Sequence, residues 1–439
     1  MDEARRKLLL SALCGTGWLG LRALATGLPV GLLAAPLRAR AAVEGECHAV
    51  APQRLILITS AGGEPLNANV PGCYGDTAIY HPAAATMAAT DLTIGGVLTK
   101  AAKPWADLSP DLLARTCFFH HATYSAAHGD AAKVNALMGA VKRQELLVSL
   151  IAKNTAPCLA TTQFQPLVLS QNLITYAGAV LPVLTPSALR NVLGNPAGVL
   201  GTLRSLRDAD LDRLNALYKQ DGTAAQRALL DEFALSQQQA RGLSAELLKR
   251  LDTIRGSSRE DLNSAAVVLL KMNVSPVVVM TYSFGGDNHS DGGLAQEARE
   301  TVLSVTALAD LVAKLKDETY DLYDSTTIVF QGVFGRTLNA ANRGGNANGR
   351  DHNATHHCSV LIGKNVRSSL IGGVTANGHD FRAQGIDSAT GSASATGDVP
   401  YEATLAAVGK TVAAAVGVER AVIDDQITAG KVISPALVA

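Results

Sequence analysis

The chain has 439 residues, of which 47% are hydrophobic and 17% charged, and its 38 basic side chains balance 38 acidic ones. Disordered chains combine low hydrophobicity with high net charge, so this composition indicates a globular protein. Zero net charge argues against the broad basic surface that duplex nucleic acid requires, and no nucleic-acid partner is expected.

Residues 1–41 have the three parts of a secretory signal peptide. Arg5 and Arg6 open a basic start, a Gly-, Ala- and Leu-rich stretch follows, and residues 39–41 (Ala-Arg-Ala) form a small-x-small exit. The paired arginines indicate the twin-arginine export machinery as a partner. Arg22 interrupts the apolar stretch, whereas a membrane anchor needs about 20 apolar residues. We therefore expect signal cleavage, an exported protein that is periplasmic or extracellular, and no membrane span after cleavage.

Five cysteines follow this segment, at positions Cys47, Cys73, Cys117, Cys158 and Cys358. Disulfides are stable in an exported compartment, but an odd number leaves at least one thiol without an intramolecular partner. The spacing contains no CxxC pair that would indicate zinc or redox chemistry. We expect at most two disulfides, and the pairing stays open.

Short β-branched runs alternate with helical patterns along the rest of the chain. The runs predict buried strands at residues 54–60, 276–282, 326–330 and 357–362. Apolar spacing predicts helices at residues 261–272, 294–316 and 401–416. Residues 185–255 are helical in character and are expected to form a helical insertion. Strands that alternate with helices predict an α/β fold with a largely parallel sheet.

Polar, glycine-rich loops follow three of the predicted strands, at residues 61–67, 285–291 and 331–356. In an open parallel sheet, ligands bind beyond the carboxyl ends of the strands. The three loops should therefore meet at one edge, and the functional site is expected there.

Imidazole and carboxylate groups occur together in these loops. Asp287 with His289, and Asp351 with His352, offer donors that suit Zn²⁺ or Mn²⁺. The alternative is that such residues only satisfy the backbone of a turn. His120, which follows two phenylalanines, could equally be a hydrogen-bonded core residue.

Two arginines lie in the same loops. Arg336 and Arg350 are permanently charged and fork-shaped, and either could hold a phosphate or sulfate oxyanion in a bidentate manner. Thr59, Ser60 and Thr123 lie near the same edge, but their residue types fit structural roles, and no nucleophile is assigned.

In chain order, these motifs resemble an exported bacterial family known only as domain of unknown function 1501, within the alkaline phosphatase/sulfatase superfamily. The matching segments are Gly62-Gly63-Glu64-Pro65-Leu66-Asn67, Ala127-His128-Gly129, Gly286-Asp287-Asn288-His289, Val333-Phe334-Gly335-Arg336-Thr337 and Gly349-Arg350-Asp351-His352. The resemblance implies one doubly wound domain over residues 42–439. It also implies a divalent-metal site and hydrolysis of small anionic esters of phosphate or sulfate. By residue matching, Asp287, His289, His352 and His128 would be metal ligands.

The sequence departs from the family pattern at three positions. Pro65, with Glu64 beside it, replaces an Asp, Val333 replaces a Glu, and Gly286 replaces an aromatic residue. Losing two carboxylates weakens the binding of divalent cations, so two full metal positions are not expected. Two functions therefore stay open: a metal-dependent ester hydrolase, or a non-catalytic member that acts in binding or envelope assembly.

Overall fold

The structure is a computed structural model, and it describes residues 47–193, 204–224, 226–227, 230–231, 250–339 and 349–438. The predicted signal peptide and part of the predicted insertion lie outside the described residues, so these two assignments stay predictions. Among the described residues, no helix is both long enough and apolar enough to cross a membrane.

A seven-stranded sheet forms the centre of the fold, with strand order β13-β4-β12-β9-β1-β8-β5. Its strands are β1 (Arg54–Ser60), β4 (Thr116–His121), β5 (Leu167–Val168), β8 (Val277–Met280), β9 (Thr326–Gly332), β12 (His357–Ile362) and β13 (Ser369–Ile371). All four predicted strands are among them. Strand β12 is antiparallel to both neighbours, and the other pairings are parallel. The largely parallel sheet is therefore confirmed.

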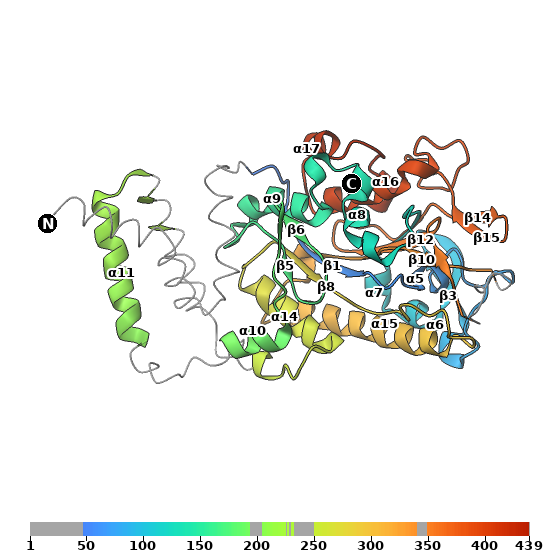
Figure 1. The fold of residues 1–439 in the computed structure, drawn as a ribbon, viewed down its shortest axis with the longest axis horizontal. Coiled ribbons are helices and arrows are strands. Elements are labelled where there is room, and N and C mark those ends of the chain that lie inside the picture. The colour runs from blue at the N-terminus through green and yellow to red at the C-terminus, as the bar shows by residue number, and fades with distance from the viewer. Residues whose placement is uncertain are drawn as a thin grey trace.

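Helices cover both faces of this sheet (Figure 1). The main ones are α9 (Leu147–Leu159), α14 (Arg259–Lys271), α15 (Ala295–Lys316) and α16 (Thr404–Ala415). Successive residues of a strand point to opposite faces. Accordingly, Ile56 and Ile58 of β1 belong to the core with α14 and α15, while Leu55 and Leu57 belong to the core with α9 and α16. A sheet buried on both faces is the doubly wound architecture that was expected.

The predicted helices begin and end close to the expected residues. Helix α14 starts with a capping box, because the Ser258 hydroxyl accepts from the Asp261 N–H while the Asp261 carboxylate accepts from the Ser258 N–H. The described part of the predicted insertion includes the helices α10 (Pro186–Leu193) and α11 (Arg204–Asp221).

Smaller elements connect the main ones, and sequence patterns did not predict them. Short strands pair in hairpins: β2 (Ala89–Ile94) with β3 (Val97–Ala102), β6 (Thr175–Tyr176) with β7 (Ala179–Val180), β10 (Gly335–Arg336) with β11 (His352–Asn353), and β14 (Val374–Asn377) with β15 (Asp380–Ala383). Short helices are α5 (Leu66–Asn69), α6 (Lys103–Ala106), α7 (Pro110–Leu113), α8 (Ala131–Asn135) and α17 (Arg420–Gln426), with 3₁₀ turns that include η2 (His128–Asp130) and η8 (Ser434–Ala436).

One disulfide joins Cys47 to Cys158, with 5.0 Å between their Cα atoms. Cys73, Cys117 and Cys358 are free and buried. The bridge ties the segment before β1 to helix α9, and it agrees with the expectation of at most two disulfides.

Candidate metal centre

Five predicted ligands come together beyond the carboxyl ends of the central strands. They are His128, Asp287, His289, Asp351 and His352, and we call them the His–Asp cluster. Turn η2 supplies the first, the loop after β8 supplies the next two, and the connection from β9 to β12 supplies the last two. Because β12 is antiparallel, the chain enters it from the edge at which β9 ends, which keeps this connection beside the other loops. The structure thus assembles the residues, and their role as ligands stays a prediction.

The donor atoms of the cluster are separated by distances that suit a shared cation. Nε2 of His289 lies 2.9 Å from Nε2 of His352 and 3.0 Å from Oδ1 of Asp287. Nε2 of His128 lies 3.5 Å from Oδ2 of the same carboxylate. Two ligands at about 2.0–2.1 Å from a tetrahedral Zn²⁺ are about 3.3 Å apart. The observed separations bracket this value.

Backbone carbonyls fix the tautomers of two imidazoles. Nδ1 of His128 lies 2.7 Å from the carbonyl oxygen of Ala61, and Nδ1 of His352 lies 2.6 Å from that of Ala126. A carbonyl oxygen only accepts, so each Nδ1 carries the ring proton and each Nε2 has a free lone pair. Histidines that bind metals are commonly oriented in this way.

The third imidazole, His289, lies between two carboxylates and the ring of His352. Nδ1 of His289 lies 3.5 Å from Oδ1 of Asp351, whereas its Nε2 lies 3.0 Å from Oδ1 of Asp287 and 2.9 Å from the Nε2 lone pair of His352. A ring proton on Nε2 would serve these two shorter contacts. A divalent cation would take the place of that proton, because metal binding requires a free lone pair. Arg336 offers a donor here, but its Nη1 lies 3.4 Å from Nε2 of His289, which is long for a hydrogen bond. Together with the carboxylate of Asp287, the three rings define a position for a divalent cation.

The electrostatics of the cluster favour the protonation states that bind metals. Partial burial acts to raise the pKa of Asp287, but Arg336 and His289 outweigh it, and the pKa lies below its ordinary value. Burial lowers the pKa of His352, despite its hydrogen bond to Ala126. Carboxylate and neutral imidazole are the ligand forms. The side chain of Asp287 is 53% exposed, so a solute can reach the cluster.

Arg336 is fully buried next to the cluster, and its contacts differ from the oxyanion contact that we expected. Its Nε donates to the carbonyl of Gly63 at 2.7 Å, and its Nη2 donates to the carbonyl of Gly62 at 2.6 Å and to Asp287 at 3.1 Å. We expected this guanidinium to hold a substrate oxyanion. Instead, carbonyl groups of the loop after β1 (residues 61–67) point toward it and accept its hydrogen bonds. Arg336 therefore orients Asp287.

The first loop approaches Arg336 closely because of a glycine. Gly63 has a φ of +67°, and a Cβ at this position would lie 1.7 Å from a ring atom of Phe334. No side chain fits such a contact, so the residue must be glycine for the loop to pack against Phe334. The Phe334 ring in turn packs against His352, with ring centroids 4.3 Å apart.

Arg350 is also turned into the protein, which does not fit the expected oxyanion contact. Its guanidinium is buried and forms a bidentate ion pair with Glu297, at 2.7 Å for Nε–Oε2 and 3.1 Å for Nη2–Oε1. Its other hydrogen bonds go to the carbonyls of Thr337 and Tyr80. Arg350 is bidentate as predicted, but its partner is a carboxylate of the chain itself.

Glu297 joins the loops that carry the cluster. It lies in the first turn of α15, is fully buried, and accepts from Asn69 at 3.0 Å and Asn288 at 2.9 Å besides Arg350. Asn288 and Arg350 each precede a cluster residue, so one carboxylate sets the spacing between two ligand-bearing loops. Gly349 allows this approach, because a Cβ there would lie 2.0 Å from the carbonyl oxygen of Asn288. Sequence reasoning missed Glu297, since an acidic residue in a first helical turn is usually solvated.

Glu64 lies beside Pro65, the position at which the resemblance predicts an Asp, and it has a structural role. Its carboxylate is buried and accepts from the Ser60 hydroxyl at 2.7 Å and from the N–H groups of Phe284 and Gly286 at 2.6 and 2.9 Å. Burial raises its pKa in spite of these hydrogen bonds. The carboxylate thus holds the end of β1 to the loop after β8, and the Ser60 hydroxyl is engaged in the same contact.

A second group of metal-type side chains, Cys73, His120 and His356, is fully buried. Asn67, whose amide orientation is fixed by two hydrogen bonds to the backbone of β10, donates to Nδ1 of His356 at 3.1 Å. Nε2 of His356 therefore carries the proton and donates to Nδ1 of His120 at 2.9 Å, and Nε2 of His120 donates to the carbonyl of Pro71 at 2.8 Å. The four ring nitrogens are all satisfied, so this group is a hydrogen-bond chain of the core.

The pKa values agree with this assignment. Burial lowers the pKa of His120 to about 4 and raises that of the Cys73 thiol well above its ordinary value. A protonated thiol and a fully bonded imidazole are poor ligands, because a metal binds the thiolate and a free lone pair. The His–Asp cluster differs, because the Nε2 lone pairs of His128 and His352 are free.

Comparison with known proteins gives a partial family match. A family model described as "Protein of unknown function (DUF1501)" matches residues 198–384. That range holds four cluster residues and both arginines, and it excludes His128. No curated protein matches. Among solved structures, the lipoteichoic acid synthase LtaP from Listeria monocytogenes is similar with a TM-score of 0.30 and 12% identity, over 74% of this chain and 69% of that chain.

Proposed function

We propose that the chain is a metal-dependent hydrolase of phosphate or sulfate esters that holds one divalent cation, Zn²⁺ or Mn²⁺, in the His–Asp cluster. The observation that carries this proposal is the gathering of three imidazoles around the carboxylate of Asp287, with the Nε2 atoms of His128, His289 and His352 at 3.5, 3.0 and 3.9 Å from its oxygens. Three imidazoles with a carboxylate suit Zn²⁺ or Mn²⁺, whereas Ca²⁺ and Mg²⁺ prefer oxygen ligands alone.

In the proposed reaction, the bound cation and the residues around it have different roles. A bound divalent cation would polarise the ester oxygen and lower the pKa of a water molecule. Asp287 and Asp351 compensate the two charges of such a cation, and the buried Arg336 leaves the centre with a net positive charge. That balance favours a small anionic substrate. Arg336 keeps Asp287 in place, and the carbonyl of Ala126 keeps the Nε2 atom of His352 directed at the centre.

A non-catalytic role in binding or envelope assembly is the second candidate. Glu64 uses its carboxylate to accept backbone hydrogen bonds, and the position of the family's second acidic residue is the buried, apolar Val333. The cluster therefore has two carboxylates, which supports one cation and not two. A binding protein that retains one cation would have the same geometry.

The proposal also covers the cellular compartment in which the protein acts. We propose export through the twin-arginine machinery to the periplasm or the extracellular space. The support is the arrangement of Arg5 and Arg6 before an apolar stretch, together with the Cys47–Cys158 disulfide, because disulfides persist in oxidising compartments.

The test is hydrolysis of aryl phosphates and aryl sulfates by the purified chain with added Zn²⁺ or Mn²⁺. We expect turnover that a chelator abolishes and that Asp287→Asn reduces by at least about 100-fold, as expected when a charged ligand is lost. His379→Ala is the matched control, because His379 is an exposed histidine outside the cluster. Stoichiometric metal without turnover of either ester class would contradict the hydrolase and support the second candidate.

A further inference from the structure

The loop between β4 and turn η2, residues 122–127, provides two contacts of the His–Asp cluster. The carbonyl of Ala126 accepts from Nδ1 of His352 at 2.6 Å. His128 follows the loop directly, and its Nε2 lies 3.5 Å from a carboxylate oxygen of Asp287. The loop itself contains neither helix nor strand, so its position depends on contacts with other parts of the fold.

Tyr124 lies in the middle of this loop and has a disfavoured backbone conformation. Its φ is +58°, in the left-handed region that glycine adopts most easily. A residue with a large side chain persists there only where the surrounding contacts hold it. The backbone N–H groups of Thr123 and Tyr124 both donate to the carbonyl of Ala354, at 3.0 and 2.8 Å. These hydrogen bonds join the loop to the segment that directly follows His352 and Asn353.

The hydroxyl group of Tyr124 ties the loop to the start of helix α16. It donates to the carbonyl of Tyr401 and accepts from the N–H of Thr404 at 3.1 Å, and the Thr404 hydroxyl lies 2.9 Å away. The first N–H groups of a helix have no partner within the helix, and the Tyr124 hydroxyl satisfies one of them. The Thr404 hydroxyl also accepts from the N–H of Ala122 at 3.2 Å, which holds the beginning of the same loop.

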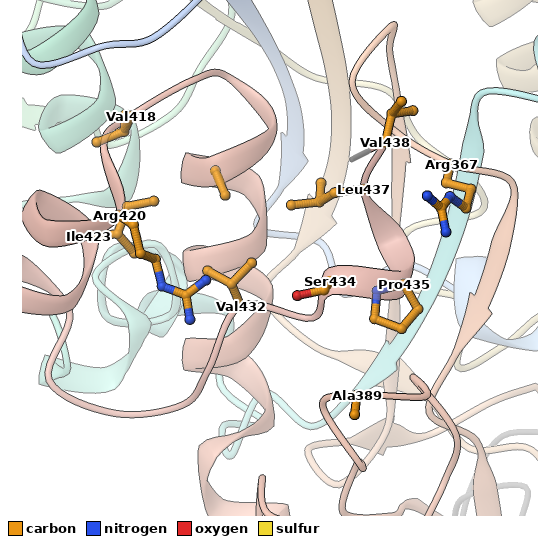
Figure 2. A pocket seen from close by; sticks show the side chains of 11 residues that line it. Arg367, Ala389, Val418, Arg420, Ile423, Val432, Ser434, Pro435, Leu437 and Val438 are labelled. Atoms are coloured by element: carbon orange, nitrogen blue, oxygen red, sulfur yellow. The ribbon is translucent and has the colours of Figure 1, made fainter.

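Helix α16 is a firm support for this contact, because it is buried along most of its length. Residues 404–413 are all buried. At the other end of the helix, Val418, Ile423 and Val432 pack in the same hydrophobic core, with exposed fractions of 4%, 0% and 5% (Figure 2). Close-packed elements of a core move little. The core of the protein therefore sets the position of the Tyr124 hydroxyl.

We propose that Tyr124 is a positioning residue of the His–Asp cluster, whose hydroxyl fixes the loop that orients His352 and leads into His128. The inference rests on the metal centre of the proposed function, and Tyr124 acts on that centre through the loop and not as a ligand. Without the hydroxyl, the Ala126 carbonyl no longer selects one tautomer of His352. The Nε2 lone pair that a cation needs is then present in only part of the molecules.

The test includes a readout that needs no metal. In the full chain with isotope-labelled histidine, freed of metal by a chelator, NMR distinguishes a ring protonated at Nδ1 from one protonated at Nε2, and His352→Gln identifies the signals of His352. We expect the wild type to carry the proton of His352 on Nδ1. Tyr124→Phe, which removes only the hydroxyl, should give a mixture of both tautomers. Its dissociation constant for Zn²⁺, measured against a competing chelator, should rise by about tenfold, as is typical when a group that orients a metal ligand is lost.

Tyr74→Phe is the matched control, because the Tyr74 hydroxyl also donates to a backbone carbonyl, that of Met87, outside the cluster. It should lose a similar amount of stability in urea and keep both the tautomer of His352 and the zinc affinity of the wild type. The inference is overturned if Tyr124→Phe keeps the proton of His352 on Nδ1, or if Tyr74→Phe changes the tautomer to the same extent. A wild type that binds no zinc would contradict the proposed function, whereas the tautomer measurement would still decide the role of Tyr124.

Discussion

Glu297 and Arg350 form a buried, bidentate ion pair between the first turn of α15 and the loop that leads into the His–Asp cluster. The exposed fractions of the two side chains are 0% and 2%. Asn69 and Asn288 donate to the same carboxylate, so its oxygens accept four hydrogen bonds. The pair sets how far apart the loops of His289 and Asp351 lie.

Breaking this pair should strongly destabilise the fold. Glu297→Gln leaves a buried guanidinium without its counter-charge, which typically costs about 3–5 kcal/mol. Urea unfolding measures the loss in the free energy of unfolding. The control is Asp111→Asn, which removes an exposed ion pair with Lys316 and should cost less than about 1 kcal/mol. Equal losses for the two variants would show that the buried pair does not hold the loops.

Acid should destabilise the protein between about pH 6.5 and pH 4 through its buried histidines. Burial lowers the pKa of His121 to about 4, with the nearby His120 acting in the same direction, while the unfolded chain keeps an ordinary value of about 6.5. In this window the unfolded state binds a proton that the folded state excludes. Stability is therefore complete above pH 6.5 and falls with pH, by about 3 kcal/mol for a fully buried ring.

The measurement is the free energy of unfolding from pH 7.5 to pH 5. His121→Gln should flatten the pH dependence, because His121 lies in the core among His120, His357 and Ser359 and would no longer titrate. His379→Gln, at an exposed position, should leave the pH dependence unchanged. A His121→Gln curve parallel to that of the wild type would contradict the assignment.

The Cys47–Cys158 disulfide should stabilise the domain by about 2–4 kcal/mol, because it closes a long loop in the unfolded chain. A reductant should lower the melting temperature of the wild type. The melting temperature of Cys158→Ala should be lower from the start and insensitive to the reductant, since the other described cysteines are already free thiols. A wild type that melts at the same temperature with and without reductant would argue against the bridge.

Much of the fold follows from the sequence, because its signals are local. The β-branched run that ends at Ser60 and the capping residues Ser258 and Asp261 act within a few positions, so strand β1 and helix α14 were predicted nearly to their ends. Short hairpins such as β2–β3 were missed, since an exposed two-stranded element leaves little hydrophobic pattern.

The candidate site was predicted less completely, because its geometry depends on contacts between distant residues. Strand-end placement was enough to bring His289 and His352 together. The role of Arg350 could not be read from its own loop, since its partner Glu297 lies on a helix 53 positions away. Likewise, Asn67 belongs to a recognised motif, yet only the fold shows that it fixes the tautomer of His356.

The metal content of the protein tests the central claim most directly. The chain is purified without a histidine tag, and metal is quantified by mass spectrometry before and after equilibration with Zn²⁺ or Mn²⁺. We predict one tightly bound cation per chain in the wild type and in the His379→Ala control, and none in the His289→Ala/His352→Ala double variant. A folded wild type that takes up no stoichiometric cation, or a double variant that retains it, would contradict the assignment of the His–Asp cluster as a metal centre.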